Sequence, residues 1–208
     1  MTNIAINGIG RIGKLALKIL VSKNFNIKYI NELNGNPSNL IHSLEFDSIH
    51  SKWIADFIAN NNSIKINEKV IKTTFYNKIE NLDLDKIDIV IDCTGANNNK
   101  TALKKYFDKG VKKVIVSAPI HEENVANIAY GVNQQSYIPS NHNIITAASC
   151  TTNCIAPIIK VLHEQIGICH GSITTIHNIT NSQTLVDLPQ NNLRRARSAI
   201  NNLIPSTT

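Results

Sequence analysis

Short apolar runs alternate with helical patterns along most of the chain. The first run covers residues 3–7 and ends at Gly8, and residues 11–22 then carry apolar side chains at helical spacing. Later strand-like runs lie at residues 27–30, 87–92, 113–116 and 144–147, and later helical patterns lie at residues 101–107 and 155–165. Because nearly continuous apolar runs are buried on both faces, the pattern predicts an α/β fold with a mostly parallel sheet covered by helices.

The region between residues 51 and 84 alternates less clearly. Four of its apolar residues indicate a hairpin at the edge of the sheet: Ile64, Ile66, Val70 and Ile71. The chain has no internal repeat and no linker rich in Pro, Gly or Ser. We predict a first domain over residues 1–149 and the beginning of a second domain over residues 150–208.

Composition argues against several classes of protein. With 208 residues, 42% of them hydrophobic and 17% charged, the chain is long enough for one or two domains with a real core. We expect a soluble cytoplasmic protein, because the first residues lack a secretory pattern and no apolar segment approaches the length of a membrane span. The net charge of +6 comes from scattered Lys and Arg, which argues against a nucleic-acid partner. Four cysteines without zinc spacing predict a reducing compartment and no bound metal.

A glycine loop follows the first predicted strand. Gly8, Gly10 and Gly13 fit the G-x-G-x-x-G pattern between a strand and a helix. The first glycine permits a tight turn, the second lets the backbone approach a pyrophosphate, and the third allows the helix to pack closely on the strand. The loop therefore indicates a dinucleotide site, with an ordinary strand-to-helix turn as the alternative.

A carboxylate at the end of the second strand supports this interpretation. Glu32 lies roughly 20 residues beyond the last glycine, where it can accept both ribose hydroxyls and repel a 2′-phosphate, so we expect NAD rather than NADP. Two later strands end in Asp92-Cys93-Thr94-Gly95 and Ser117-Ala118-Pro119, at the carboxyl edge where such sheets bind ligands. Taken alone, each of these two segments is more typical of a simple strand terminus.

Cys150 is the candidate nucleophile. It lies where a strand ends and a helix begins, and the field of a helix N-terminus lowers the pKa of a thiol. We expect Cys93, Cys154 and Cys169 to be buried packing residues. His177 ends the β-rich run of residues 172–176 and is the candidate base, since a Cys and a His on separate elements form a recognisable catalytic pair.

The most specific pattern in the chain surrounds this cysteine. It reads Ala148-Ser149-Cys150-Thr151-Thr152-Asn153-Cys154-Ile155-Ala156-Pro157, and it is accompanied by Thr174-Thr175-Ile176-His177, Leu193-Arg194-Arg195-Ala196-Arg197, Tyr130-Gly131-Val132-Asn133 and Ile204-Pro205. With these motifs and the glycine loop, the chain resembles the phosphorylating, NAD-dependent glyceraldehyde-3-phosphate dehydrogenase family over essentially its whole length. The resemblance implies a Rossmann-like NAD-binding domain followed by the first part of an α+β catalytic domain.

The resemblance also implies a mechanism and a set of contacts. Cys150 would attack the aldehyde of glyceraldehyde 3-phosphate, His177 would take the hydroxyl proton as hydride passes to NAD, and inorganic phosphate would cleave the thioester to an acyl phosphate. Residues expected at the cofactor are Gly8, Gly10, Arg11, Ile12, Gly13, Glu32, Thr94, Gly95 and Ser117. Residues expected at the substrate or phosphate are Ser149, Thr151, Thr180 and Thr208, with Arg195 or Arg197 at an anion site or, alternatively, in a solvated loop. In this family residues 178–199 pack against a neighbouring subunit, which implies a homotetramer.

The sequence departs from the usual family pattern at Glu32, where Asp is common. The same Glu is found in erythrose-4-phosphate dehydrogenases and in an arsenic-resistance branch that would use arsenate in place of phosphate. The segments 170–177 and 180–184 resemble the arsenic-resistance branch, as does Phe46-Asp47-Ser48-Ile49-His50. The acceptor and the choice between the two phosphorylated aldehydes stay open.

The C-terminus is the second departure, since Thr208 falls just before the family's glycine-containing substrate loop. We therefore expect a C-terminally truncated chain, which leaves a non-catalytic NAD-binding remnant or one piece of a split enzyme as alternatives. A redox-sensing thiol protein would account for Cys150 alone and for none of the substrate motifs.

Overall fold

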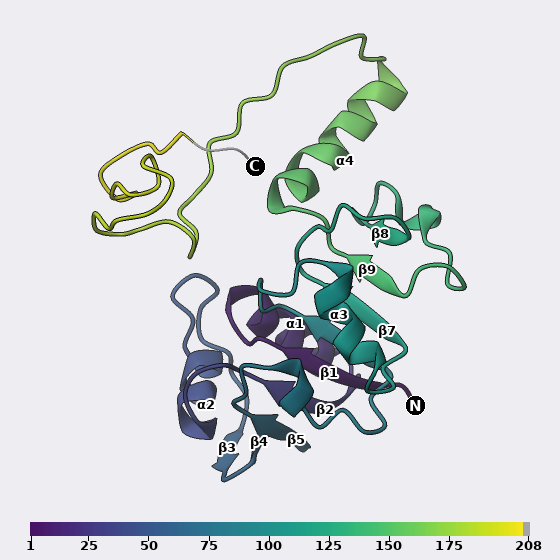
Figure 1. The fold of residues 1–208 in the computed structure, drawn as a ribbon, viewed down its shortest axis with the longest axis vertical. Helices are drawn as coiled ribbons and strands as arrows, with labels where there is room; N and C mark the ends of the chain where they lie inside the picture. The colour runs from purple at the N-terminus through teal and green to yellow at the C-terminus, as the bar shows by residue number, and fades with distance from the viewer. Residues whose placement is uncertain (206–208) are drawn as a thin grey trace. The chain divides into compact units, whose positions relative to one another are not determined.

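The computed structural model describes residues 1–205, which form two compact units (Figure 1). The first unit covers Met1–Pro157 and the second begins at Ile158. The predicted domain boundary between residues 149 and 150 stays a prediction, and the first compact unit extends beyond it into the helix that follows.

One sheet runs through the first unit. Its strands, in the order in which they pair, are β3 (Phe57–Asn60), β4 (Ser63–Ile66), β5 (Lys69–Thr74), β2 (Asn26–Asn31), β1 (Asn3–Asn7), β6 (Ile89–Asp92), β7 (Lys113–Val116), β9 (Ile144–Thr146) and β8 (Val125–Asn127). Every pairing is parallel except those of β4 with β3 and with β5. The predicted parallel sheet and the predicted edge hairpin are both confirmed.

Helices α1 (Arg11–Ser22) and α2 (Pro37–Glu45) cover one face of this sheet, and α3 (Lys100–Phe107) covers the other. A fourth helix, α4 (Cys150–Gln165), follows the last strand, and two short 3-10 turns lie at Ile79–Asn81 and Gln134–Ser136. Local capping explains where two of the helices begin. The side chain of Asn36 accepts from Asn39 N at the start of α2, and that of Asn99 accepts from Ala102 N at the start of α3.

Alternating strand residues divide the core into two clusters. On one face Ala5, Val90 and Val114 pack with Leu103 and Tyr106 of α3. On the other face, Leu17 of α1 and Leu40 of α2 pack with Ile6 of β1, Ile30 of β2 and Ile64 of β4. Because neighbouring strand residues point to opposite faces, Ala5 and Ile6 belong to different clusters. The sheet is thus buried on both faces, as the apolar runs predicted.

Three elements were missed and one was wrongly predicted. The sequence reasoning missed α2 and the short strands β3 and β8, whereas it predicted a strand over the β-rich residues 172–176. Within residues 1–205 this segment is irregular and belongs to no ladder of the sheet. A strand needs a hydrogen-bonded neighbour, and β-rich composition alone does not supply one.

The second unit contains the end of α4 and a long irregular chain. No helix or strand is assigned between Gln165 and Pro205. Side chains nevertheless fold part of this chain into a loop, in which Thr184 Oγ1 donates to the carbonyls of Arg195 and Arg197, and Ser198 Oγ donates to that of Leu185. Within residues 1–205, each helix is too short or too polar to span a lipid bilayer.

Candidate functional site

The glycine loop fits tightly against the end of β6. Gly8 has a φ of 88°, and a Cβ built on it would lie 2.8 Å from the carbonyl carbon of Cys93 and from the nitrogen of Thr94. A Cβ on Gly13 would lie 1.9 Å from Gly8 O, whereas a Cβ on Gly10 would meet nothing within 4 Å. The first and third glycines are therefore required by the packing of the protein itself. The second leaves open space for a ligand to approach the backbone.

Glu32 faces this loop from the end of β2. Its Oε2 accepts from Ile9 N at 2.6 Å and its Oε1 accepts from Leu33 N at 2.8 Å. Each carboxylate oxygen has a second lone pair, so the two ribose hydroxyls of a dinucleotide could still donate to this group. Glu32, the predicted contact of the ribose, is thus hydrogen-bonded to the glycine loop, which is the predicted contact of the pyrophosphate.

The ends of β6 and β7 lie at the same edge of the sheet. Thr94 donates from its N and its Oγ1 to Asp92 Oδ1, at 2.9 and 2.7 Å, and Ser117 N donates to Asp92 O at 2.9 Å. Cys93 lies between Asp92 and Thr94 in the chain, and burial raises the pKa of its thiol to about 11, which keeps it protonated and unreactive. The predicted contacts Thr94, Gly95 and Ser117 therefore lie at the carboxyl edge that also carries the glycine loop.

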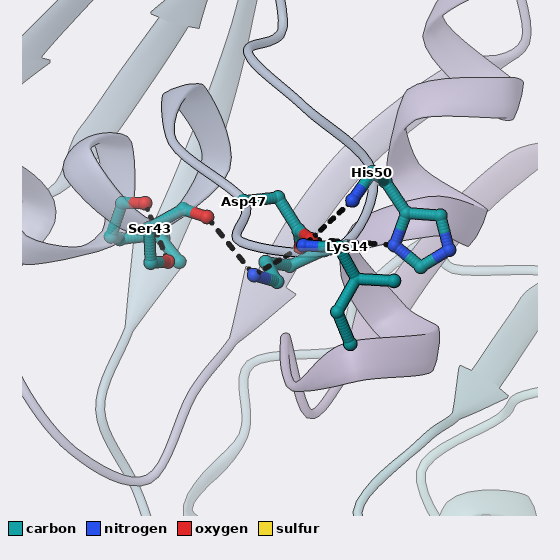
Figure 2. Close-up of polar contacts among 6 residues, drawn as sticks. Lys14, Ser43, Asp47 and His50 are labelled. Atoms are coloured by element: carbon teal, nitrogen blue, oxygen red, sulfur yellow. Dashed lines mark hydrogen bonds and ion pairs between the residues drawn. The ribbon is translucent and has the colours of Figure 1, made fainter. Parts of the chain in front are cut away.

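A charged cluster fixes the loop after α2 to the first turn of α1 (Figure 2). Lys14 Nζ lies 2.7 Å from Asp47 Oδ2 and donates to Ser43 O at 3.2 Å. The Oδ1 of Asp47 accepts from the backbone nitrogens of Ile49 and His50, and the His50 ring lies 3.3 Å from the same oxygen. The hydrogen bond from Lys14, followed by those from the backbone of His50 and Ile49, holds the pKa of the Asp47 carboxyl well below its ordinary value.

This cluster gives the stability of the fold a pH dependence. Because the pKa of Asp47 is lowered by folding, its ion pair stabilises the protein above the ordinary carboxyl pKa, and that contribution is lost as the pH falls below it. We expect the melting temperature of the wild type to fall more steeply than that of Asp47→Asn between about pH 5 and about pH 2. Asp108→Asn, which removes an exposed pair with Lys104, is the control and should keep the wild-type slope. Parallel curves for the wild type and Asp47→Asn would contradict the assignment.

Cys150 is the first residue of α4, directly after a sharp turn. Ala148 adopts a left-handed backbone with φ of 55°, and Ala147 N donates to Val116 O at 2.9 Å, which holds the turn against β7. Ser149 Oγ accepts from Thr152 N at 3.0 Å, as a helix cap does. The exposed Cys150 therefore lies in the first turn of a capped helix, at the edge where β9 ends, together with Ser149 and Thr151.

The expectation for two other cysteines was wrong. Cys154 and Cys169 are both exposed, whereas Cys93 is half-buried. Apolar residues follow Cys154, and this pattern was taken as evidence of burial. Several of those residues are themselves exposed, among them Ile158 and Ile159, so the pattern did not mark a covered face.

The remaining predicted residues belong to the second unit. His177 is exposed, and its Nδ1 lies 2.6 Å from Asn178 O. Thr180 N donates to Gln183 Oε1 at 2.9 Å. Arg197 forms an ion pair with Asp187, whose Oδ1 also accepts from Ser198 N at 2.8 Å. Thr208 lies outside the described residues.

Comparison with known proteins decides the family. Residues 2–100 match the NAD binding domain of glyceraldehyde 3-phosphate dehydrogenase, and residues 149–208 match the C-terminal domain of the same enzyme family. The chain belongs to the glyceraldehyde 3-phosphate dehydrogenase family.

Relatives from distant bacteria match along the whole chain. Glyceraldehyde-3-phosphate dehydrogenase 3 of Nostoc is 44% identical over 208 residues, 99% of this chain and 61% of the relative. The enzymes of Geobacillus stearothermophilus and Thermotoga maritima are 42% and 41% identical, over 99% and 100% of this chain and 62% and 63% of their own lengths. The chain thus spans about three fifths of the length of these relatives.

Membership of this family defines the cofactor. The glycine loop, Glu32 and Thr94-Gly95 all lie within the region that matches the NAD binding domain, so the cofactor is NAD. The open space over Gly10 and the free lone pairs of Glu32 fit a dinucleotide.

Sequence reasoning missed three polar residues that support this site. Asn7 and Asn31 are buried at the ends of β1 and β2, and the buried Tyr106 projects from α3 toward them. A signal existed for the asparagines, because each one is the last residue of its strand, directly before Gly8 or Glu32. No sequence signal marked Tyr106, since an aromatic residue at helical spacing is expected in any core.

Proposed function

We propose that this chain carries the NAD site and the nucleophile of an enzyme that oxidises glyceraldehyde 3-phosphate with inorganic phosphate. One observation carries the proposal: Cys150 begins a capped helix at the sheet edge that also holds the glycine loop. Anionic groups are stabilised at helix N-termini, and a thiolate is the reactive form of cysteine. An exposed cysteine at this place is therefore suited to attack a carbonyl carbon.

The chemistry proceeds in two stages on Cys150. Its thiolate adds to the aldehyde carbon while the protonated imidazole of His177 gives its proton to the oxygen, which forms a hemithioacetal. His177 then takes this proton back as the C–H hydride leaves. NAD, when bound, accepts that hydride. The resulting thioester is then cleaved by inorganic phosphate, which releases the acyl phosphate and returns the thiolate. A covalent intermediate divides one difficult reaction into two easier ones.

The substrate contacts are assigned by family motif. Ser149 and Thr151 flank the nucleophile, and Thr180 and Thr208 complete the proposed phosphate contacts. Arg195 or Arg197 is proposed for an anion site, and Arg197 forms an ion pair with Asp187. The homotetramer, the cytoplasmic location and the use of arsenate are likewise proposals based on the family motifs.

A turnover assay with the purified chain tests the proposal. NADH formation is followed at saturating NAD, with glyceraldehyde 3-phosphate or erythrose 4-phosphate as substrate and with phosphate or arsenate as acceptor. NADH formation that requires glyceraldehyde 3-phosphate and an acceptor supports the proposal. NAD binding without any turnover would instead support the non-catalytic alternative, and faster turnover of erythrose 4-phosphate would change the substrate.

Glu32 should determine the preference for NAD over NADP. Glu32→Gln removes the charge that repels a 2′-phosphate, so the ratio of the two dissociation constants should move toward NADP by about tenfold or more. Calorimetric titration with both cofactors measures this without requiring turnover. Glu68→Gln is the control, because Glu68 is an exposed carboxylate in the turn between β4 and β5. Equal binding of NAD and NADP by the unmodified chain would contradict the role of Glu32.

A further inference from the structure

Three polar side chains form a buried row across the parallel strands. Asn31 on β2, Asn7 on β1 and Asp92 on β6 are partners in register, so they lie side by side on one face of the sheet. All three are buried, with exposed fractions of 3%, 6% and 1%. Asn31 Nδ2 donates to Asn7 Oδ1 at 2.8 Å, which joins the first two residues directly.

Tyr106 joins the row to Asp92. Its fully buried hydroxyl accepts from Asn7 Nδ2 at 2.6 Å and donates to Asp92 Oδ2 at 2.7 Å. Burial, reinforced by the charge of Asp92, raises the pKa of Tyr106 far above its ordinary value, so the phenol stays protonated and keeps donating. The Tyr106 hydroxyl on α3 thus links the side chains at the ends of β1 and β6.

The row is hydrogen-bonded at both ends. Asp92 also accepts from Asn97 Nδ2 at 2.7 Å and from the nitrogen and hydroxyl of Thr94. At the other end, Asn31 Oδ1 accepts from Thr74 Oγ1 and from Tyr76 N, each at 2.9 Å. Buried polar groups are costly unless they are paired, and networks in which every member is paired hold one arrangement rigidly.

Each member of the row directly precedes part of the cofactor site. Asn7 is followed by Gly8, Asn31 by Glu32, and Asp92 lies two residues before Thr94. Backbone hydrogen bonds join the ends of the same three strands, since Gly8 N donates to Asn31 O at 2.8 Å and Cys93 N donates to Asn7 O at 2.7 Å. A shift of any member would therefore move the loop or the carboxylate that contacts the dinucleotide.

We propose that Tyr106 is a positioning residue for NAD, which acts by holding Asn7 and Asp92 in register beneath the glycine loop. The proposal rests on NAD binding at this loop and adds a determinant of its affinity on α3. Because Tyr106 is fully buried, it acts through the spacing of the strand ends rather than on the cofactor directly.

Tyr106→Phe tests the proposal, with Leu103→Val as the matched control. Leu103 is fully buried on the same helix and in the same core cluster, but its apolar side chain makes no hydrogen bond to the row. We expect Tyr106→Phe to weaken NAD binding by about 3- to 10-fold in calorimetric titration, and Leu103→Val to leave it within about 2-fold. Hydrogen exchange without NAD should be faster at residues 8–10 and 94–97 in Tyr106→Phe alone.

The outcomes separate this proposal from the proposed function. Equal NAD affinity and equal exchange in the two variants would overturn the role of Tyr106, whereas a wild-type chain that binds no NAD would overturn the cofactor site itself. If circular dichroism shows Tyr106→Phe to be unfolded, Asp92→Asn takes its place, because an amide has one acceptor oxygen and cannot accept from both Tyr106 and Thr94 as the two carboxylate oxygens do. The same loss of affinity is then expected, and wild-type affinity in Asp92→Asn would overturn the proposal.

Discussion

Cys150→Ser should abolish the formation of NADH from glyceraldehyde 3-phosphate while NAD still binds. Serine keeps the size and the helix position of the cysteine, but its hydroxyl is almost never ionised at neutral pH, so the carbonyl is no longer attacked. Loss of a nucleophile that acts together with a base lowers turnover by up to about 10⁶-fold. Turnover is measured as NADH absorbance, and NAD binding by calorimetric titration of the same preparation.

Cys154→Ser is the matched control for this change. Cys154 is also exposed and lies one helical turn further along α4, so it reports any general effect of removing a thiol from this helix. We expect it to keep wild-type turnover. Normal turnover in Cys150→Ser would refute the covalent mechanism, and equal losses in both variants would point to a disturbed helix rather than to a lost nucleophile.

The fold was predictable where the pattern was local and strongly periodic. The helix at residues 11–22 was predicted with the bounds that the structure gives, because a glycine loop marks its start and apolar spacing marks its extent. The helix at Pro37–Glu45 was missed although Asn36 and Pro37 form an N-terminal signal, since its apolar residues are few. The short strand Val125–Asn127 is recognisable only by its pairing with β9.

The candidate site was predictable as motifs but not as contacts. Glycine spacing predicted the loop, yet its packing against Cys93 and Thr94 joins residues that are far apart in sequence. The same is true of Tyr106, which reaches Asn7 across 99 positions of the chain. Patterns of spacing report local geometry, whereas side-chain pairs between distant segments follow from the topology of the sheet. In the second unit the local pattern predicted a strand that the structure lacks, because the β-rich residues 172–176 have no strand partner among residues 1–205.

Gly13→Ala should have the largest effect on the stability and the NAD binding of the first unit. The added methyl would lie 1.9 Å from Gly8 O and 2.9 Å from Gly8 C, and both contacts are with backbone that cannot rotate away. Helix α1 would have to move off the loop, which should lower the free energy of unfolding by about 1–3 kcal/mol or more and remove measurable NAD binding. Urea denaturation and calorimetric titration measure the two effects.

Gly10→Ala is the variant that separates packing from binding. A methyl at residue 10 meets nothing within 4 Å, and the φ of −71° suits any residue, so the urea midpoint should match that of the wild type. The same methyl would occupy the space in which a pyrophosphate approaches the backbone, so NAD should bind at least about tenfold more weakly. Wild-type affinity in Gly10→Ala would place the phosphates elsewhere, and a wild-type urea midpoint in Gly13→Ala would contradict the close approach of α1 to Gly8. Together the two variants distinguish a glycine that the protein needs for its own packing from one that the cofactor needs.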